Sequence, residues 1–379
     1  MLFRSHSNYA DLCPLSGHYP LRSTEVHLYP KNPSYPRVPI YDLLDSLGWH
    51  TAVISSQNEI WGHMINFLQT GHIDHFFHSE NYDGPTYVPR HDDGFSDFLK
   101  GSRRSGKIDD RFTVAEAIRW IDSNDDGAPF FIYLNLQNSH LPYETPADFP
   151  RRFGPETIDF AIRFGGFPYD KLDVVKDLYA DSLAYSDFQI GKLIAHLREI
   201  GQWDRTLLVV TGDTGQAFYE HGTVAHAGAI WNEVMRVPLV IRAPGMTPAV
   251  DPRPAQQIDV PPTVLDLLGL PPHPGYQGRS LVGPYDGSDR SRFLIAQTPL
   301  AQQFGIVRGD FKLIYDLKLD QNNLFDLAND PHERRNVAST HRKRLEQYRT
   351  LLDTWRKHQI DYYRDPALHA TTYPPVLPD

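Results

Sequence analysis

The chain has 379 residues and a formal net charge of −10, and 40% of its residues are hydrophobic. This composition is typical of a globular protein with a sizeable core, in two domains or in one large domain with an appendage. No apolar run approaches the roughly 18 residues of a membrane-spanning helix. The acidic balance argues against a protein that binds nucleic-acid phosphates, which requires clustered Lys and Arg. The single cysteine, Cys13, excludes an intrachain disulfide and a thiolate zinc site.

Short β-rich apolar runs alternate with stretches of helical periodicity over the first 240 residues. In chain order, the predicted elements are helix 41–47, strand 51–54, helix 113–121, strand 130–134, helix 172–200, strand 206–210 and strand 237–241. Gly48 ends the first helix, and one apolar stripe runs along the long helix 172–200. This alternation predicts an α/β fold with a mainly parallel sheet.

The pattern changes after about residue 300. Residues 304–307 and 311–315, separated by Arg308-Gly309-Asp310, predict an antiparallel hairpin. A final amphipathic helix follows, with an apolar face formed by Leu345, Tyr348, Leu351, Leu352 and Trp355. We therefore predict an α/β catalytic domain over 1–300, and a small C-terminal β-plus-helix subdomain with an extended tail over 301–379.

Three predicted strands lead into polar loops that carry candidate site residues. Asn58 follows strand 51–54, His140 follows strand 130–134, and Asp213 follows strand 206–210. Ligands of open α/β sheets bind beyond the carboxyl ends of parallel strands, so these three side chains are expected to converge. A lone His or Asp in such a position is more often a hydrogen-bonded surface residue or a turn former; the combination is the more specific signal.

A second group follows Asp213 in the segment Glu220-His221-Gly222-Thr223-Val224-Ala225-His226. A carboxylate and two imidazoles just beyond a strand end are suited to binding a divalent cation or an anionic group. These residues alone do not distinguish a divalent cation from an anionic group as the ligand.

From about Thr113 to Ala338 the sequence resembles the sulfatase family of the alkaline phosphatase-like superfamily. Six stretches match in order: FIYLNLQNSHLPY (131–143), YSDFQIGKLIAHLREIGQWDRTLLVVTGDTG (185–215), EHGTVAHAGAIWNEVMRVPLVIRAPG (220–245), IDVPPTVLDLLGL (258–270), QGRSL (277–281) and LFDLANDPHERRNVA (324–338). The resemblance implies a doubly wound sheet and a hydrolase of sulfate esters that uses a divalent cation, namely calcium, magnesium or manganese.

The resemblance also implies roles for individual residues. His140 matches a His that binds the substrate, and Asp213 matches a metal-binding Asp. His226 matches a basic residue that contacts the ester oxygens. Asn58, at the first strand end, is the remaining substrate-binding candidate.

Three departures from the family pattern bear on the metal site and on the nucleophile. The family's opening strand with its Asp pair has no counterpart before residue 7, so we expect an N-terminally truncated domain. Thr214 stands where the family has a His, which leaves Asp213 and Thr214 as an incomplete metal site. The maturation motif C-x-P-S-R, which converts Cys or Ser to formylglycine, is absent.

In the family, a turn of the type TGRYP ends thirteen residues after the nucleophile. Ser16-Gly17-His18-Tyr19-Pro20 resembles that turn, so the resemblance implies that Ser7 is at the nucleophile position. Phosphoryl-transfer relatives use an unmodified Ser or Thr at this position, although a helix N-cap is an equally ordinary role for Ser7. Cys13 lies six residues later and is interpreted as a small buried residue.

Three hypotheses follow. The first is a metal-dependent sulfate-ester hydrolase, and the second is a phosphodiesterase or head-group transferase that uses Ser7 directly. The third is a degenerate homologue with little or no turnover. The alcohol stays open among glycan, lipid head-group and small aryl esters, with specificity expected in loops 60–112 and 144–170.

A basic cluster, Arg103-Arg104-Ser105-Gly106-Lys107, is suited to contacting an anionic substrate, although a solvated surface loop is its more ordinary interpretation. Met1 leads directly into polar sequence without a secretory leader, which by itself favours the cytoplasm. The expected truncation reduces the weight of that observation.

Overall fold

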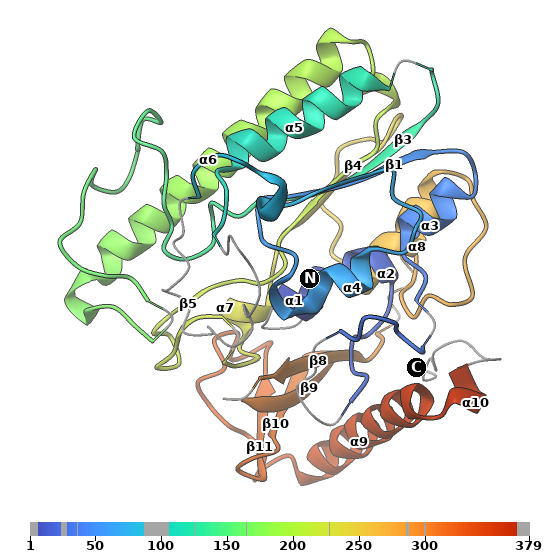
Figure 1. Ribbon diagram of the computed structural model, residues 1–379. Coiled ribbons are helices and arrows are strands. Elements are labelled where there is room, and N and C mark those ends of the chain that lie inside the picture. Colours follow the sequence, from blue (N-terminus) through green and yellow to red (C-terminus); the bar gives the residue numbers. More distant parts are fainter. Residues whose placement is uncertain are drawn as a thin grey trace. The chain divides into compact units, whose positions relative to one another are not determined.

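The structure is a computed structural model that describes residues 7–23, 29–35, 37–86, 106–124, 126–163, 165–226, 228–285, 287, 289–298 and 301–369 (Figure 1). The chain divides into two compact units. The parallel-sheet unit comprises residues 28–32 and 41–206, and the antiparallel-sheet unit comprises residues 1–27, 33–40 and 207–379.

The parallel-sheet unit is built on a three-stranded sheet in the order β2-β1-β3. Strands β1 (His50–Ser55), β2 (His75–Phe77) and β3 (Phe130–Asn135) are all parallel, and Ser55 pairs with Asn135 at the carboxyl ends of β1 and β3. Because these two strands end in register, the loops after them begin side by side.

The helices of this unit are α3 (Ile40–Asp45, all but its first residue), α4 (Met64–Leu68), α5 (Asp110–Ser123) and α6 (Leu172–Glu199). Helix α5 begins at an N-cap, where the Asp109 carboxylate accepts a bond from the Arg111 backbone N–H at 2.9 Å. Helices α5 and α6 lie side by side in Figure 1. Ala117, Trp120 and Ile121 of α5 pack with strand residues Ala52 and Ile54 in the core.

The antiparallel-sheet unit begins with two short helices, α1 (Ser7–Ala10) and α2 (Cys13–Ser16). Gly17 ends α2 at φ 62°, and its backbone N–H returns to the Cys13 carbonyl. A Cβ atom at Gly17 would lie 2.7 Å from the Tyr276 ring, so this turn requires glycine.

The next elements of this unit are β4 (Leu208–Thr211), β5 (Ala217–Phe218), β6 (Val224–Ala225), α7 (Asn232–Met235), β7 (Leu239–Arg242) and α8 (Val260–Leu267). Strands β4 and β7 form an antiparallel pair, and β5 and β6 form a small hairpin.

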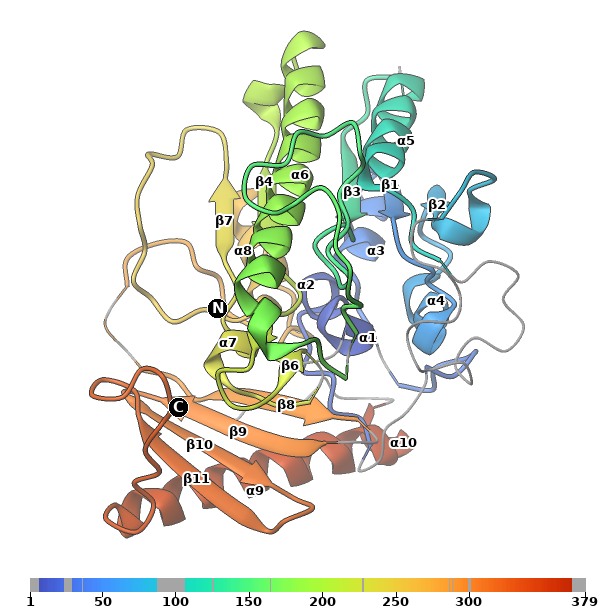
Figure 2. The same cartoon turned by 90° about the vertical axis from the view of Figure 1, so that its left-hand side faces the viewer.

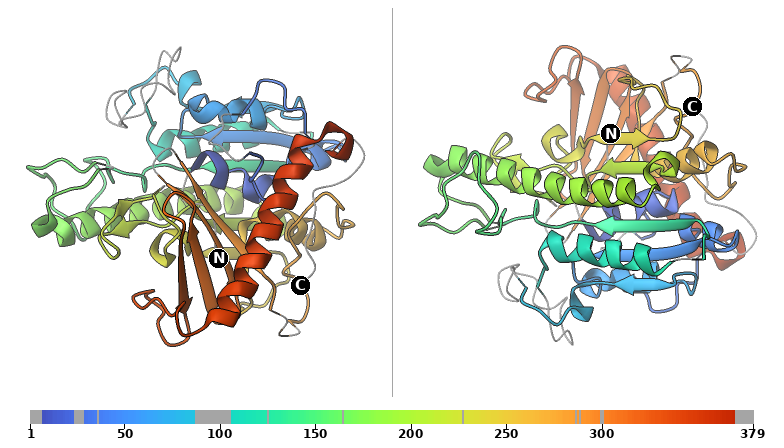
Figure 3. Two further views of the ribbon diagram at one scale, coloured as in Figure 1. Left: turned by 90° about the horizontal axis from the view of Figure 1, so that it is seen from below. Right: turned by 90° about the horizontal axis from the view of Figure 1, so that it is seen from above.

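A four-stranded antiparallel sheet in the order β11-β10-β9-β8 completes the unit. Its strands are β8 (Arg292–Gln297), β9 (Gln302–Arg308), β10 (Phe311–Asp316) and β11 (Gln321–Asp326), followed by α9 (Arg342–Arg364) and α10 (Pro366–His369). Figures 2 and 3 show α9 lying across this sheet. Tyr348, Leu352 and Trp355 of α9 are buried in its core, and the Arg349 guanidinium lies 3.2 Å from the Tyr315 ring centroid.

The α/β fold and the small C-terminal antiparallel sheet are confirmed. Each predicted helix and strand is present, with ends that differ by a few residues. Strand 237–241 corresponds to β7, which is antiparallel to β4 rather than parallel. Strands β2, β5, β6, β8 and β11 were not predicted. In the described part of the chain, no helix combines the length and apolar character that crossing a bilayer requires. The 1–300 and 301–379 domain boundary stays a prediction.

Candidate active site

The loop that follows β1 is a polar segment that is buried despite its composition. Ser56, Gln57, Asn58 and Glu59 are each at most 5% exposed. The Glu59 carboxylate accepts bonds from the Ser55 hydroxyl at 2.5 Å and from the Asn135 amide at 3.4 Å. Burial raises the pKa of Glu59, and the hydrogen bonds oppose that rise.

Asp110, at the start of α5, joins the loops after β1 and β3. One carboxylate oxygen accepts bonds from the Ser56 hydroxyl at 2.8 Å and the Gln137 backbone N–H at 2.7 Å. The other accepts from the Asn138 backbone N–H at 3.2 Å and the Ser186 hydroxyl at 2.9 Å. Burial raises the pKa of Asp110 to about 6, even against these four donors. Asp110 therefore positions the segment that leads to His140.

The raised pKa of Asp110 predicts a pH-dependent stability. The folded state retains the proton up to about pH 6, whereas the unfolded side chain releases it near 3.8. The contribution of Asp110 to stability is therefore greatest below pH 4 and is lost as the pH rises from about 4 to about 6, by about 3 kcal/mol for this buried group.

Asp110→Asn removes this dependence and places an NH₂ group against N–H donors, so we expect it to destabilise the protein by about 1–3 kcal/mol at pH 7. The stability gap to wild type should be larger at pH 4 than at pH 7 in urea unfolding. Asp177→Asn, an exposed substitution on α6, is the matched control. A gap that is the same at both pH values would contradict the prediction.

His140 and Asn58 both lie in this unit. The His140 backbone N–H donates to the Gln137 carbonyl at 3.0 Å, and ring Nδ1 donates to the Leu141 carbonyl at 2.7 Å. The Asn58 amide donates to Glu80 at 3.0 Å and accepts from the Ile60 backbone N–H at 3.0 Å. Asn58 is thus part of a local turn, whatever its role toward substrate.

Asp213 and Thr214 follow β4 in the antiparallel-sheet unit. The Asp213 carboxylate accepts the Thr214 backbone N–H at 2.6 Å, and the Gln257 amide donates to the Asp213 carbonyl at 3.0 Å. Gly215 is packed so closely against α7 that a Cβ atom there would lie 2.2 Å from the Glu233 carbonyl oxygen. These contacts hold the loop after β4 in one conformation.

The hairpin β5–β6 carries the second candidate group. The Gln216 amide contacts His226 Nδ1 at 3.2 Å. His221 Nδ1 donates to Glu233 at 2.6 Å, and its ring stacks on Trp231 with a centroid separation of 4.0 Å. His221 thus anchors the hairpin turn to α7, while His226 lies at the end of β6.

Ser7 is the first residue of α1, as a nucleophile at a helix start requires, and its side chain lies outside the described part of the structure. Cys13 is buried and its thiol donates to the Tyr9 carbonyl at 3.2 Å, which agrees with its interpretation as a small buried residue. It is the first residue of α2.

The candidate residues fall into two groups. Asn58 and His140 belong to the parallel-sheet unit, and Ser7, Asp213, Thr214 and His226 belong to the antiparallel-sheet unit. Convergence of the two groups stays a prediction.

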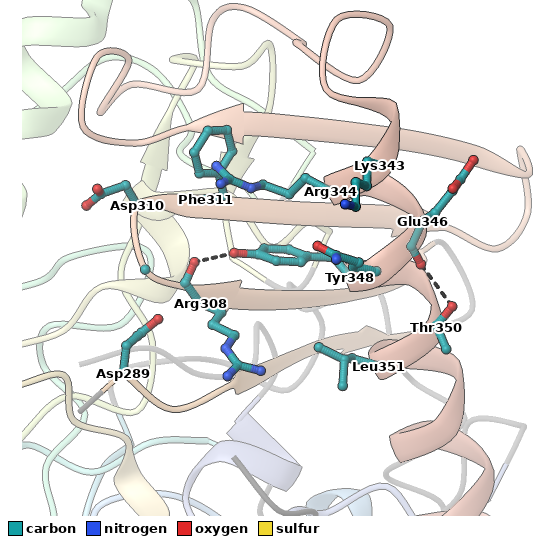
Figure 4. A pocket seen from close by; sticks show the side chains of 12 residues that line it. Asp289, Arg308, Asp310, Phe311, Lys343, Arg344, Glu346, Tyr348, Thr350 and Leu351 are labelled. Carbon is teal, nitrogen blue, oxygen red and sulfur yellow. Dashed lines mark hydrogen bonds between the residues drawn. The ribbon is translucent and has the colours of Figure 1, made fainter.

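A cavity of about 1090 Å³ lies elsewhere, between the start of α9 and the β9–β10 turn (Figure 4). Its lining includes Arg308, Lys343 and Arg344 together with Asp310 and other acidic side chains. None of the candidate residues lines it, and its balanced charges do not select an anionic ligand.

Two protein-family models match this chain. A model described as Sulfatase matches residues 13–270, more than half of the chain. The chain belongs to the Sulfatase family. A second model, described as N-sulphoglucosamine sulphohydrolase, C-terminal, matches residues 220–361 of this sulfatase-family chain.

Choline-sulfatase of Rhizobium meliloti is 30% identical over 199 residues, which are 47% of this chain and 37% of that protein. The sulfatase-family chain therefore spans well under half the length of that relative.

The fold agrees with solved structures of low sequence identity. The structure of BT4656 in complex with its substrate D-glucosamine-2-N,6-O-disulfate aligns with a TM-score of 0.69 at 19% identity, over 98% of this chain and 92% of that chain. Phosphonate monoester hydrolase of Agrobacterium radiobacter aligns with a TM-score of 0.64 at 19% identity, over 97% and 88%.

The family generally uses a divalent cation, and the donors described in this sulfatase-family chain do not complete a site for one. Asp213 and Thr214 offer one carboxylate and one hydroxyl, whereas calcium or magnesium takes six or more oxygen ligands. Within the described ranges, no three His, Cys, Asp or Glu side chains are grouped to hold a metal ion. The predicted pair is at most part of a coordination sphere.

Sequence reasoning missed Glu59 and Asp110 in this sulfatase-family chain, and it considered Lys107 only as one member of a basic cluster. Asp109-Asp110 before an amphipathic segment signals a helix N-terminus, but nothing local in the sequence indicates that Asp110 binds loops on two other elements. That role depends on partners 27 to 76 residues away.

Proposed function

We propose that this chain hydrolyses sulfate esters. The observation that carries the proposal is the Sulfatase family match over residues 13–270. The overall reaction cleaves the ester with water, releasing an alcohol and inorganic sulfate. His140 and His226 are the residues to which we assign substrate binding and proton transfer, with Ser7 at the nucleophile position and Asn58 as a further substrate-binding residue.

The geometry of His140 supports its assignment. Its Nδ1–H is bound to the Leu141 carbonyl, which fixes the tautomer and the ring orientation, so we assign proton transfer to Nε2. A leaving alkoxide requires a proton from a positioned acid, and the imidazolium form of His140, which carries a proton on both ring nitrogens, donates one from Nε2 and keeps Nδ1–H on the Leu141 carbonyl.

The substrate class we favour is a small sulfated sugar or another small sulfate ester. Support comes from the second family model, whose description names N-sulphoglucosamine, and from the neighbour solved with a disulfated glucosamine. Choline-sulfatase, with 30% identity, makes choline sulfate the second candidate.

A phosphodiesterase or phosphonate esterase is the alternative. Ser7 stands at the nucleophile position without the C-x-P-S-R motif, and the neighbours include a phosphonate monoester hydrolase. The incomplete metal donors instead favour the third hypothesis, in which turnover is small or absent.

The test is to assay the purified chain with an aryl sulfate, glucosamine N-sulfate, choline sulfate and an aryl phosphodiester. Each assay is run with EDTA and with added calcium, magnesium or manganese. We expect a sulfate ester to be the best substrate, with a rate that rises on metal addition. Preferential turnover of the phosphodiester would establish the alternative, and no turnover with any metal would support the degenerate homologue.

A further inference from the structure

Lys107 lies inside the polar network at the carboxyl ends of β1 and β3. Its ammonium donates to the side-chain carbonyl of Gln137. The Gln137 side-chain amide donates in turn to Asn135 at 2.8 Å, and the Gln137 backbone carbonyl accepts the His140 N–H at 3.0 Å. One residue therefore links Lys107 to the turn that carries His140.

Residues 107–110 are attached to the loops after β1 and β3 by two backbone N–H groups. The Ile108 N–H donates to the Ser56 carbonyl at 2.9 Å, and the Asp110 N–H donates to the Asn138 side chain at 2.8 Å. These bonds attach residues 107–110 to both loops at once. The position of the ammonium is therefore set by the sheet edge and not by a solvated loop.

Among the described residues of these loops, Lys107 supplies a positive charge. Burial lowers the pKa of His78 to about 4, so its imidazole is neutral at pH 7. The nearby cation Arg111 is bound by Asp109 at 3.0 Å and Asp148 at 2.7 Å. An anionic ester needs charged or N–H donors, and besides Lys107 the described loops after β1 and β3 offer His140, the Glu59 carboxylate, and Ser, Asn and Gln side chains.

We propose that Lys107 binds the anionic group of the substrate beside His140. Arg103 and Arg104 of the same basic cluster lie outside the described residues, so the proposal concerns Lys107 alone. It rests on the proposed function for the identity of the anion as a sulfate group. The role is binding of a substrate oxyanion by the ammonium, with no covalent step.

The alternative is that Lys107 only compensates the buried Glu59 carboxylate, whose pKa it lowers against the effect of burial. The two roles differ in what happens when Glu59 is neutralised. If Lys107 merely balances Glu59, then Glu59→Gln makes the lysine dispensable. If Lys107 binds the substrate anion, it is needed in either background.

The experiment measures binding of inorganic sulfate and phosphate by calorimetry, together with kcat and KM for the best ester substrate. We expect Lys107→Met to weaken sulfate binding and raise KM by about 10- to 100-fold, the effect of losing a charged hydrogen bond. Lys107→Arg should restore most of the affinity. Lys192→Met, an exposed lysine of α6, is the control.

The double variant Glu59→Gln/Lys107→Met decides between the two roles. Sulfate binding as weak as in Lys107→Met supports anion binding, and binding restored to the level of Glu59→Gln alone overturns it. A wild-type chain that binds neither sulfate nor phosphate also overturns the proposal. Lys107-dependent sulfate binding without turnover of any ester supports it while refuting the proposed hydrolase function.

Discussion

Lys312→Met is expected to lower the free energy of unfolding by about 3–5 kcal/mol. Lys312 of β10 and Glu333 are both fully buried, with 2.5 Å between Nζ and Oε1. Asn232 of α7 completes the group, since its side chain accepts from Lys312 at 3.1 Å and its backbone N–H donates to Glu333 at 2.7 Å. Removing the ammonium leaves a buried carboxylate without its counter-charge.

The measurement is chemical unfolding of the purified chain at pH 7. Lys357→Met, an exposed substitution on α9, is the control and should change the stability by less than about 0.5 kcal/mol. Lys312→Met/Glu333→Leu removes both charges and should recover most of the loss. If Lys312→Met is as stable as wild type, the pair is not the structural element described above.

His140→Ala is expected to lower kcat/KM for the best ester by about 100- to 10,000-fold, the usual contribution of a positioned acid or base. The ring is fixed through Nδ1 by the Leu141 carbonyl, and the backbone of this turn is held by Asp110, so the loss should come with little change in stability. Steady-state kinetics and thermal unfolding together separate the two effects.

His196→Ala is the matched control for this prediction. His196 lies on α6 and pairs with Asp122 at 2.7 Å, outside the loops that carry His140. It should retain the wild-type kcat/KM. A His140→Ala enzyme that turns over the ester as fast as the His196→Ala control would remove His140 from the proposed mechanism.

Periodicity explains why the long elements were predicted well. The 28-residue helix α6 and the amphipathic helix α9 each present a stripe that the core buries. Strand β2 has three residues, and β8 and β11 lie outside any strongly alternating run. Such strands are recognisable only from the neighbours with which they pair.

The direction of β7 illustrates a second limit. Its apolar run has the same composition as that of a parallel strand, yet it pairs antiparallel with β4, with Val209 opposite Ile241. Strand direction follows from the path of the connecting segment, which here runs through the β5–β6 hairpin and α7. The residues of the strand itself do not indicate that path.

The amino-acid sequence by itself determined the α/β class, the main helices and strands, and membership of the Sulfatase family, because apolar periodicity and ordered motifs are local properties of the chain. Tertiary structure alone decided which polar side chains are buried together: Asp110 with the loops after β1 and β3, Lys312 with Glu333, and Lys107 with Gln137. A buried charge is stable only beside its partner, and these partners lie 21 to 54 residues apart in the chain.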